Sequence, residues 1–185
     1  MKFWSNAVTR QGSAPQRIDL FKLHGSLNWL YCPTCIILDI TPFEKSVAKL
    51  VYESKRCEKC NGNVVPIIVP PTFFKVMSNH FLEQIWYKSD ELLRTAKRII
   101  FCGYSFPDAD IHIKYLLKRA ELFTRKGFEV LVINAPSDQT PEVAIDEAKR
   151  YKRFFRDKHK VHYLNGSFER FCEFGIDSSM SEYAG

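Results

Sequence analysis

The sequence predicts an α/β fold in which a parallel sheet is flanked by helices and carries an inserted four-cysteine zinc ribbon. Two observations lead to this prediction. From Val64 onward, short apolar segments alternate with segments of helical periodicity, as in parallel strands joined by helices. Before that point, four of the six cysteines form two Cys-x-x-Cys pairs, a spacing typical of structural zinc. At 185 residues, 45% of them hydrophobic, the chain is long enough to bury a core.

The first segment, residues 1–17, is polar and contains the breaker cluster Gly12-Ser13-Ala14-Pro15, so we expect a loosely ordered lead-in. Residues 18–23 alternate and predict a short strand that delivers His24 to its carboxyl end. An unshifted imidazole titrates near neutrality, so His24, followed by Gly25, is a candidate general base. A packed or surface histidine is the alternative. Structural roles are expected for His80, His112, His159 and His162.

The cysteine pairs are Cys32/Cys35 and Cys57/Cys60, and together they predict a zinc ribbon over residues 31–63. Four thiolates satisfy tetrahedral zinc and leave no open position, so the site is expected to be structural. Unrelated redox pairs or free thiols are the alternative, and an iron–sulfur cluster is less favoured by the spacing. The remaining cysteines, Cys102 and Cys172, are expected to be small buried hydrophobes.

Strands and helices alternate after the ribbon, and most boundaries carry a recognisable signal. The expected elements are a strand at 64–69 that Pro66 demotes toward an edge, a helix from Ser78 or Asn79 to about Lys97, a strand at 98–102, a helix capped by Asp110, a strand at 128–133, a helix starting at Thr140-Pro141, a strand at 160–164, and a helix at 167–174 stopped by Gly175.

Two loops follow predicted parallel strands, and the carboxyl ends of such strands share the edge where ligands bind. One loop is Gly103-Tyr104-Ser105-Phe106-Pro107-Asp108, and the other begins at Asn134. Gly103 would allow close backbone approach, while Ser105 and Asn134 could bond sugar hydroxyls. Plain strand–helix turns are the alternative for each loop, and helix capping is the leading role of Asp108 and Asp110. With His24 delivered by a third strand, the loops together favour a ligand site.

The net charge of +6 is modest, and much of it lies between Lys149 and Lys160. This basic run predicts either a solvated helix face or a patch that binds nucleic acid or phosphate. No apolar segment is long enough to cross a membrane, and the first residues show no signal peptide, so a cytoplasmic location is expected.

Three separated features together resemble the second half of the sirtuin family. They are Leu23-His24-Gly25-Ser26 followed by the cysteine pairs, then Ile100-Phe101-Cys102-Gly103-Tyr104-Ser105, then Val132-Ile133-Asn134. Their order and spacing match the family's His-Gly turn, zinc module, Gly-Thr-Ser loop and Ile-Asn strand end, over residues 20–170. The local wording is similar to the sirtuin-like domains of bacterial NAD-consuming defence proteins.

The resemblance implies a Rossmann-like NAD-binding domain over residues 18–175, with a flexible tail at 176–185. It implies that His24 acts as the base, that zinc is held by the four paired cysteines, and that NAD is contacted by Gly103, Tyr104, Ser105 and Asn134. The expected activity is cleavage of the nicotinamide–ribose bond, as an NAD hydrolase. Protein deacylation is one alternative, and an inactive zinc-ribbon module that binds nucleic acid is another.

The chain also departs from the family's pattern. Residues 1–20 contain nothing equivalent to the family's glycine-rich loop, Asp-Phe-Arg segment or Gln-Asn-Ile-Asp segment, which bind the diphosphate and seat the nicotinamide. Pro70-Pro71-Thr72-Phe73-Phe74 stands where deacylases have a Phe-Gly-Glu substrate loop. We therefore expect an incomplete, carboxyl-terminal portion of the domain, whose other half comes from a longer chain or a partner subunit.

Overall fold

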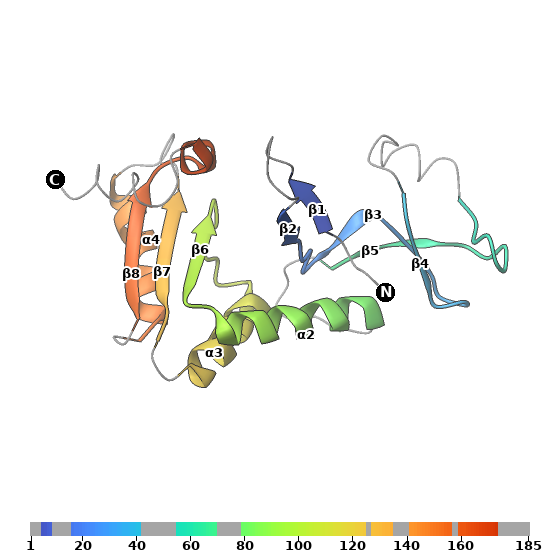
Figure 1. Ribbon diagram of the computed structural model, residues 1–185, viewed down its shortest axis with the longest axis horizontal. Helices are drawn as coiled ribbons and strands as arrows, with labels where there is room; N and C mark the ends of the chain where they lie inside the picture. The colour runs from blue at the N-terminus through green and yellow to red at the C-terminus, as the bar shows by residue number, and fades with distance from the viewer. Residues whose placement is uncertain are drawn as a thin grey trace. The chain divides into compact units, whose positions relative to one another are not determined.

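The computed structural model describes residues 5–8, 16–41, 55–69, 79–124, 127–134, 141–156 and 159–173. The chain divides into two compact units, Met1–Ser89 and Asp90–Gly185. Figure 1 shows the elements of each unit. None of the helices in the described ranges is long and apolar enough to span a membrane.

The first unit is built on a three-stranded antiparallel sheet in the order β4-β3-β5. The central strand is β3 (Gly25–Cys32), paired with β4 (Ile37–Ile40) and β5 (Val65–Ile68). A separate antiparallel pair precedes it, formed by β1 (Ser5–Val8) and β2 (Gln16–Asp19). β5 carries Pro66 and lies at the sheet edge, as expected for a strand that lacks one backbone donor.

Helix α2 (His80–Thr95) packs its first half on this unit's core. Its start is fixed by Asn79, whose side-chain oxygen accepts the backbone N–H of Phe81 at 3.0 Å. The cap predicted at Ser78 or Asn79 is therefore Asn79. Phe81, Leu82 and Ile85 recur at helical spacing and are buried against two residues of the sheet, Trp29 and Ile67.

The second unit holds a parallel three-stranded sheet in the order β6-β7-β8. Its strands are β6 (Arg98–Cys102), β7 (Glu129–Asn134) and β8 (Lys160–Asn165), joined through α3 (Ile111–Phe123) and α4 (Pro141–Phe154). The predicted α/β alternation is confirmed here. α4 starts at Pro141, where a missing backbone N–H costs nothing.

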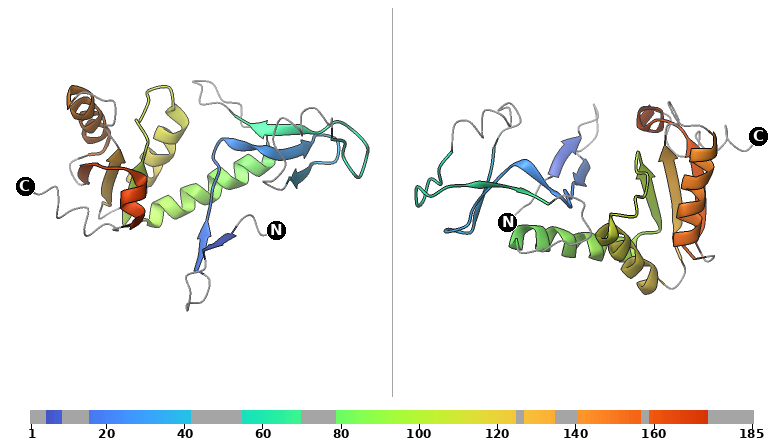
Figure 2. Two further views of the ribbon diagram at one scale, coloured as in Figure 1. Left: turned by 90° about the horizontal axis from the view of Figure 1, so that it is seen from above. Right: turned by 180° about the vertical axis from the view of Figure 1, so that it is seen from behind.

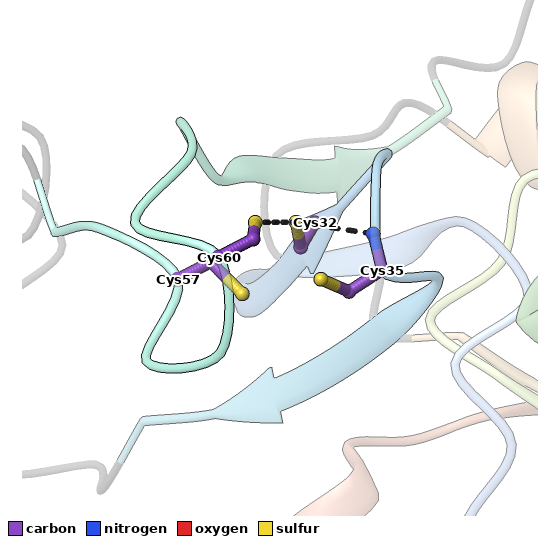
Figure 3. Close-up of side chains that lie close together, drawn as sticks. All are labelled: Cys32, Cys35, Cys57 and Cys60. Atoms are coloured by element: carbon purple, nitrogen blue, oxygen red, sulfur yellow. Dashed lines mark hydrogen bonds between the residues drawn. The ribbon is translucent and has the colours of Figure 1, made fainter.

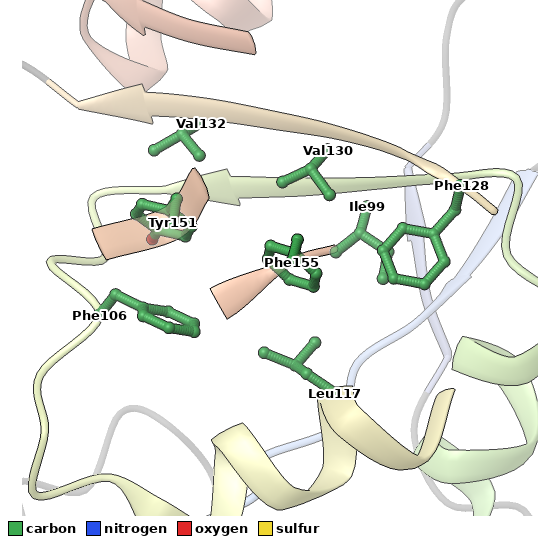
Figure 4. Packing of buried hydrophobic residues seen from close by; sticks show 8 residues of the cluster. All are labelled: Ile99, Phe106, Leu117, Phe128, Val130, Val132, Tyr151 and Phe155. Carbon is green, nitrogen blue, oxygen red and sulfur yellow. The ribbon is translucent and has the colours of Figure 1, made fainter. Parts of the chain in front are cut away.

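Side chains of β7 alternate between two cores, so both faces of the parallel sheet are covered. Val130 and Val132 pack with α3 and α4 in the larger core, which Figure 4 shows from close by. Leu131 and Ile133 face the other side, together with Phe171 of the short helix at 168–173. Figure 2 shows α4 along one face of this sheet and that short helix on the other.

Several expectations for the amino-terminal part were wrong. The strand predicted at 18–23 ends at Asp19, and the main strand is β3, which starts after His24. The strand predicted at 64–69 pairs antiparallel with β3 instead of joining the parallel sheet. Both errors have one cause: pairing partners are set by contacts distant in sequence, which a local pattern does not contain. Residues 5–8, part of the segment expected to be a loose lead-in, form a paired strand.

Candidate functional site

Four cysteine side chains converge at one end of the first unit's sheet. Cys32 ends β3 and Cys35 lies in the turn that follows, while Cys57 and Cys60 come from a second turn (Figure 3). The four Sγ atoms all lie within 4.8 Å of one another, and Cys32 and Cys60 are 3.5 Å apart. Tetrahedral zinc with Zn–S bonds of about 2.3 Å places its sulfurs about 3.8 Å apart, so the cluster fits this metal.

The two cysteine turns share one backbone feature. In each, the residue after the second cysteine is left-handed: Ile36 has φ 53° and Asn61 has φ 57°. Backbone N–H groups point at sulfur in both, from Cys35 to Cys32 at 3.5 Å and from Gly62 to Cys60 at 3.4 Å. A β-branched residue such as Ile36 is costly at positive φ, so the turn needs a stabilising interaction.

The pKa values of two thiols in the cluster, those of Cys35 and Cys57, move in opposite directions. Hydrogen bonding to Cys60, then burial, raises the pKa of Cys35 to about 12. Backbone N–H groups of Cys60 and Lys59 lower the pKa of Cys57 to about 7. The lowered pKa of Cys57 favours its thiolate, the form in which a cysteine ligates metal.

His24 lies in the turn that leads into β3, and backbone pairing holds that turn in place. Gly25 N–H donates to the Lys22 carbonyl at 2.9 Å, and Val69 N–H donates to the His24 carbonyl at 2.9 Å. The Trp86 indole N–H donates to the Leu23 carbonyl at 2.8 Å. The half-buried imidazole places Nδ1 2.9 Å from the Val69 carbonyl oxygen. A carbonyl oxygen only accepts, so Nδ1 carries the hydrogen and the lone pair of the neutral ring lies on Nε2.

The second unit brings the two predicted loops together at the carboxyl ends of its strands. Gly103 N–H donates to the Ile133 carbonyl at 3.0 Å. The Asn134 side chain makes two bonds to Tyr104: its oxygen accepts the Tyr104 N–H at 3.1 Å, and its amide donates to the Tyr104 carbonyl at 3.1 Å. Gly103 and Ser105 are exposed, whereas Asn134 is buried.

Gly103 has φ +63°, and a Cβ atom added there would meet nothing within 4 Å. Left-handed backbone suits glycine, and the open space above it permits close approach by another molecule. Of the residues predicted to bind a nucleotide, Gly103 and Ser105 are therefore exposed, whereas Tyr104 and Asn134 are hydrogen-bonded to each other.

The aspartates of this loop do not cap α3 as predicted. Asp110 occupies the N-cap position, but it makes no side-chain capping bond and instead accepts the Tyr104 hydroxyl at 3.0 Å. Asp108 forms an ion pair with Lys114 at 2.6 Å. That ammonium lowers the pKa of the Asp108 carboxyl. Asp110 therefore lies at the predicted N-cap position, but its carboxylate binds the nearby Tyr104 phenol and not a backbone N–H of the helix.

Two buried contacts of the second unit were not predicted from the sequence, although His159 was expected to have a structural role. Tyr151, expected only as a helix-face residue, is fully buried and donates its hydroxyl to the Tyr104 carbonyl at 2.6 Å. Burial, and then the Glu147 carboxylate, raises the pKa of Tyr151, so it stays a protonated donor. His159 is buried, and its Nε2 atom lies 3.4 Å from Oε1 of the fully buried Glu121. Nothing in their spacing signals these contacts, which join residues far apart in sequence.

The basic run lies on α4 and beyond it, with residues 157 and 158 outside the described ranges. Lys149, Lys152 and Arg153 are exposed. Arg150 is close to Asp146 at 3.5 Å and Arg156 is close to Glu121 at 3.9 Å, so part of this charge is balanced within the unit. Both cysteines outside the cluster were expected to be buried, but Cys102 is only half-buried, and Cys172 is exposed because its helix turns Phe171 toward the sheet.

Neither a known protein family nor a curated protein matches the sequence. Among solved structures, the chain is similar to one described as "Structural Basis for the Mechanism and Regulation of Sir2 Enzymes", with 18% sequence identity and a TM-score of 0.40. The match covers 82% of this chain and 50% of that one, so the chain spans about half the length of the solved structure. The functional assignment therefore rests on the geometry of the sites described above.

Proposed function

We propose that the protein is a sirtuin-like, NAD-consuming enzyme that cleaves the nicotinamide–ribose bond, with His24 as its base. The orientation of the imidazole supports this role. Because Nδ1–H donates to the Val69 carbonyl at 2.9 Å, the neutral ring presents its basic lone pair on Nε2 in a fixed direction. A general base needs a defined tautomer and a fixed position. The backbone hydrogen bonds of the His24 turn fix its position.

The reaction is a hydrolysis. Water adds to C1′ of the nicotinamide ribose, the bond from C1′ to the pyridinium nitrogen breaks, and nicotinamide leaves with the bonding electrons. The proton lost by water passes to Nε2 of His24, and the products are ADP-ribose and nicotinamide. Positive charge spreads over the sugar during this step, so positioning and electrostatic stabilisation account for most of the catalysis.

The carboxyl edge of the parallel sheet is proposed to bind the adenosine side of NAD. Open parallel sheets bind ligands outside the carboxyl ends of their strands. The exposed Gly103 backbone and the Ser105 hydroxyl are the groups offered to a ribose or phosphate, while Tyr104 and Asn134 complete the loop.

The four-cysteine cluster is proposed to hold structural zinc. The donor set is all thiolate and the four sulfurs are within 4.8 Å of one another, which leaves no ligand position for substrate. Zinc would fix the turn after β3 to the segment at 57–60, and no chemical step involves it.

Nicotinamide release from NAD tests the proposal, with the natural full-length polypeptide as the enzyme. His24→Asn is the informative variant, because an asparagine amide can still donate to the Val69 carbonyl but cannot act as a base. We expect release to fall by a factor of about 10² or more. The matched control is His80→Asn, at an exposed histidine of α2, which is expected to retain full activity. Undiminished release by His24→Asn would exclude the assigned role.

The same assay separates hydrolysis from deacylation. A hydrolase releases nicotinamide from NAD and water alone. A deacylase releases it only when an acyl-lysine peptide is added, so strict peptide dependence would replace the hydrolase assignment with the deacylase one.

A further inference from the structure

The loop Gly103–Asp110 is bent sharply at two points, which the sequence alone does not explain. Gly103 has φ +63° and Phe106 has φ 56°. A bulky side chain at positive φ is uncommon and is tolerated only where surrounding contacts impose it. The two bends enclose Tyr104 and Ser105, so the conformation of these two residues depends on what holds each bend.

The bend at Phe106 is held by the core. The Phe106 ring is 1% exposed and packs 4.6 Å from the Tyr151 ring and 4.9 Å from the Phe154 ring, between ring centroids. Figure 4 shows Phe106 and Tyr151 beside each other in this core. The ring of Tyr151 therefore supports one end of the loop through packing.

The Tyr104 peptide groups are held by three hydrogen bonds. Asn134 contributes two of them, and the Tyr151 hydroxyl donates the third to the Tyr104 carbonyl at 2.6 Å. The Tyr104 phenol adds a bond to the buried Asp110 at 3.0 Å. Both hydrogen-bonding groups of the Asn134 amide thus contact the loop.

We propose that Tyr151 and Asn134 are positioning residues that clamp the Tyr104 backbone and thereby set the orientation of Gly103 and Ser105 for nucleotide binding. This inference rests on the proposed function, and it gives Asn134 an indirect role instead of a direct contact with ribose. Tyr151 is 0% exposed, so it cannot touch a bound nucleotide. Any effect of its hydroxyl on nucleotide affinity must pass through the Tyr104 carbonyl.

Tyr151→Phe is the decisive variant, because it retains the ring that packs on Phe106 and removes only the hydroxyl. NAD affinity is measured by calorimetry, and loop order by hydrogen exchange at the Tyr104 amide, whose N–H is accepted by Asn134. We expect NAD binding about fivefold weaker, the equivalent of one lost hydrogen bond, and faster exchange at Tyr104 with unchanged exchange in the middle of β7. Val130→Ala is the matched control, since it destabilises the same core without a bond to the loop.

A double variant with Asn134→Ala tests the shared route. If both residues act through Tyr104, the NAD affinity of the double variant is at most about twofold lower than that of the single variant with the lower affinity. Fully multiplicative losses would overturn the indirect role of Asn134. Unchanged exchange at Tyr104 in Tyr151→Phe, or faster exchange with unchanged affinity, would overturn the clamp. Absence of NAD binding by the unaltered protein would instead overturn the proposed function, and the exchange result, which needs no ligand, would still decide whether the clamp exists.

Discussion

Substitution of Gly25 by alanine should disrupt the turn that carries His24. Gly25 has φ +77°, and an added Cβ atom would lie 2.2 Å from the Ile67 carbonyl oxygen and 2.9 Å from its carbonyl carbon. The left-handed conformation costs an alanine about 1 kcal/mol. The clash is with the backbone of β5, so it is relieved only by moving a paired strand, at about 2 kcal/mol more. We therefore expect Gly25→Ala to lower the free energy of unfolding by about 3 kcal/mol.

Gly103→Ala is a matched control for this prediction, because the backbone is again left-handed, with φ +63°, but no atom lies within 4 Å of the added Cβ. It should cost only about 1 kcal/mol. Urea unfolding followed by far-UV circular dichroism measures both variants. If Gly25→Ala costs no more than Gly103→Ala, the reasoning from the Ile67 contact is wrong.

Two further predictions concern the metal and the acid sensitivity of the second unit. Cys57→Ser should reduce bound zinc from about one equivalent to below about half, whereas Cys172→Ser, at an exposed cysteine outside the cluster, should leave it unchanged. Atomic emission on purified protein measures this, and equal zinc in both variants would contradict a four-thiolate site. Burial tends to raise the pKa of Glu121, but the Lys118 ammonium and the Arg156 backbone N–H outweigh burial, so its folded pKa lies below the ordinary 4.5. The stability it contributes is therefore present above about pH 4.5 and is lost as pH falls through the folded pKa. Glu121→Gln should cost about 2 kcal/mol near neutral pH and flatten this acid dependence, while Glu129→Gln, at a partly exposed carboxylate, should do neither in urea unfolding.

The second unit was largely predictable from sequence, because its signals are local. The apolar strands at 98–102 and 129–134, and the helix start at Pro141, depend on residues within one element. Parallel pairing follows from the helices between the strands, whose length prevents a hairpin. The first unit was predicted less well, since the identity of β3 as its central strand depends on contacts with β5, about forty residues away.

The cysteine cluster was predictable because metal ligation constrains spacing along the chain, and the sulfurs of all four paired cysteines do converge. The loop clamp was not predictable. Asn134 was expected to contact NAD, and nothing in the sequence indicates that its amide bonds Tyr104 or that Tyr151 reaches the same carbonyl. Interactions of this kind depend on the three-dimensional arrangement of a bent loop over a helix.

The indole of Trp86, bonded to the Leu23 carbonyl one residue before His24, gives the protein a built-in optical reporter. The chain's three tryptophans, at positions 4, 29 and 86, all belong to the first unit, and Trp29 is buried in its core. The second unit contributes only tyrosine among strong near-ultraviolet emitters. Intrinsic fluorescence excited at the tryptophan band therefore reports on the unit that contains His24 and the cysteine cluster, without any label. Perturbation of the cysteine cluster or of the His24 turn can be followed in this signal.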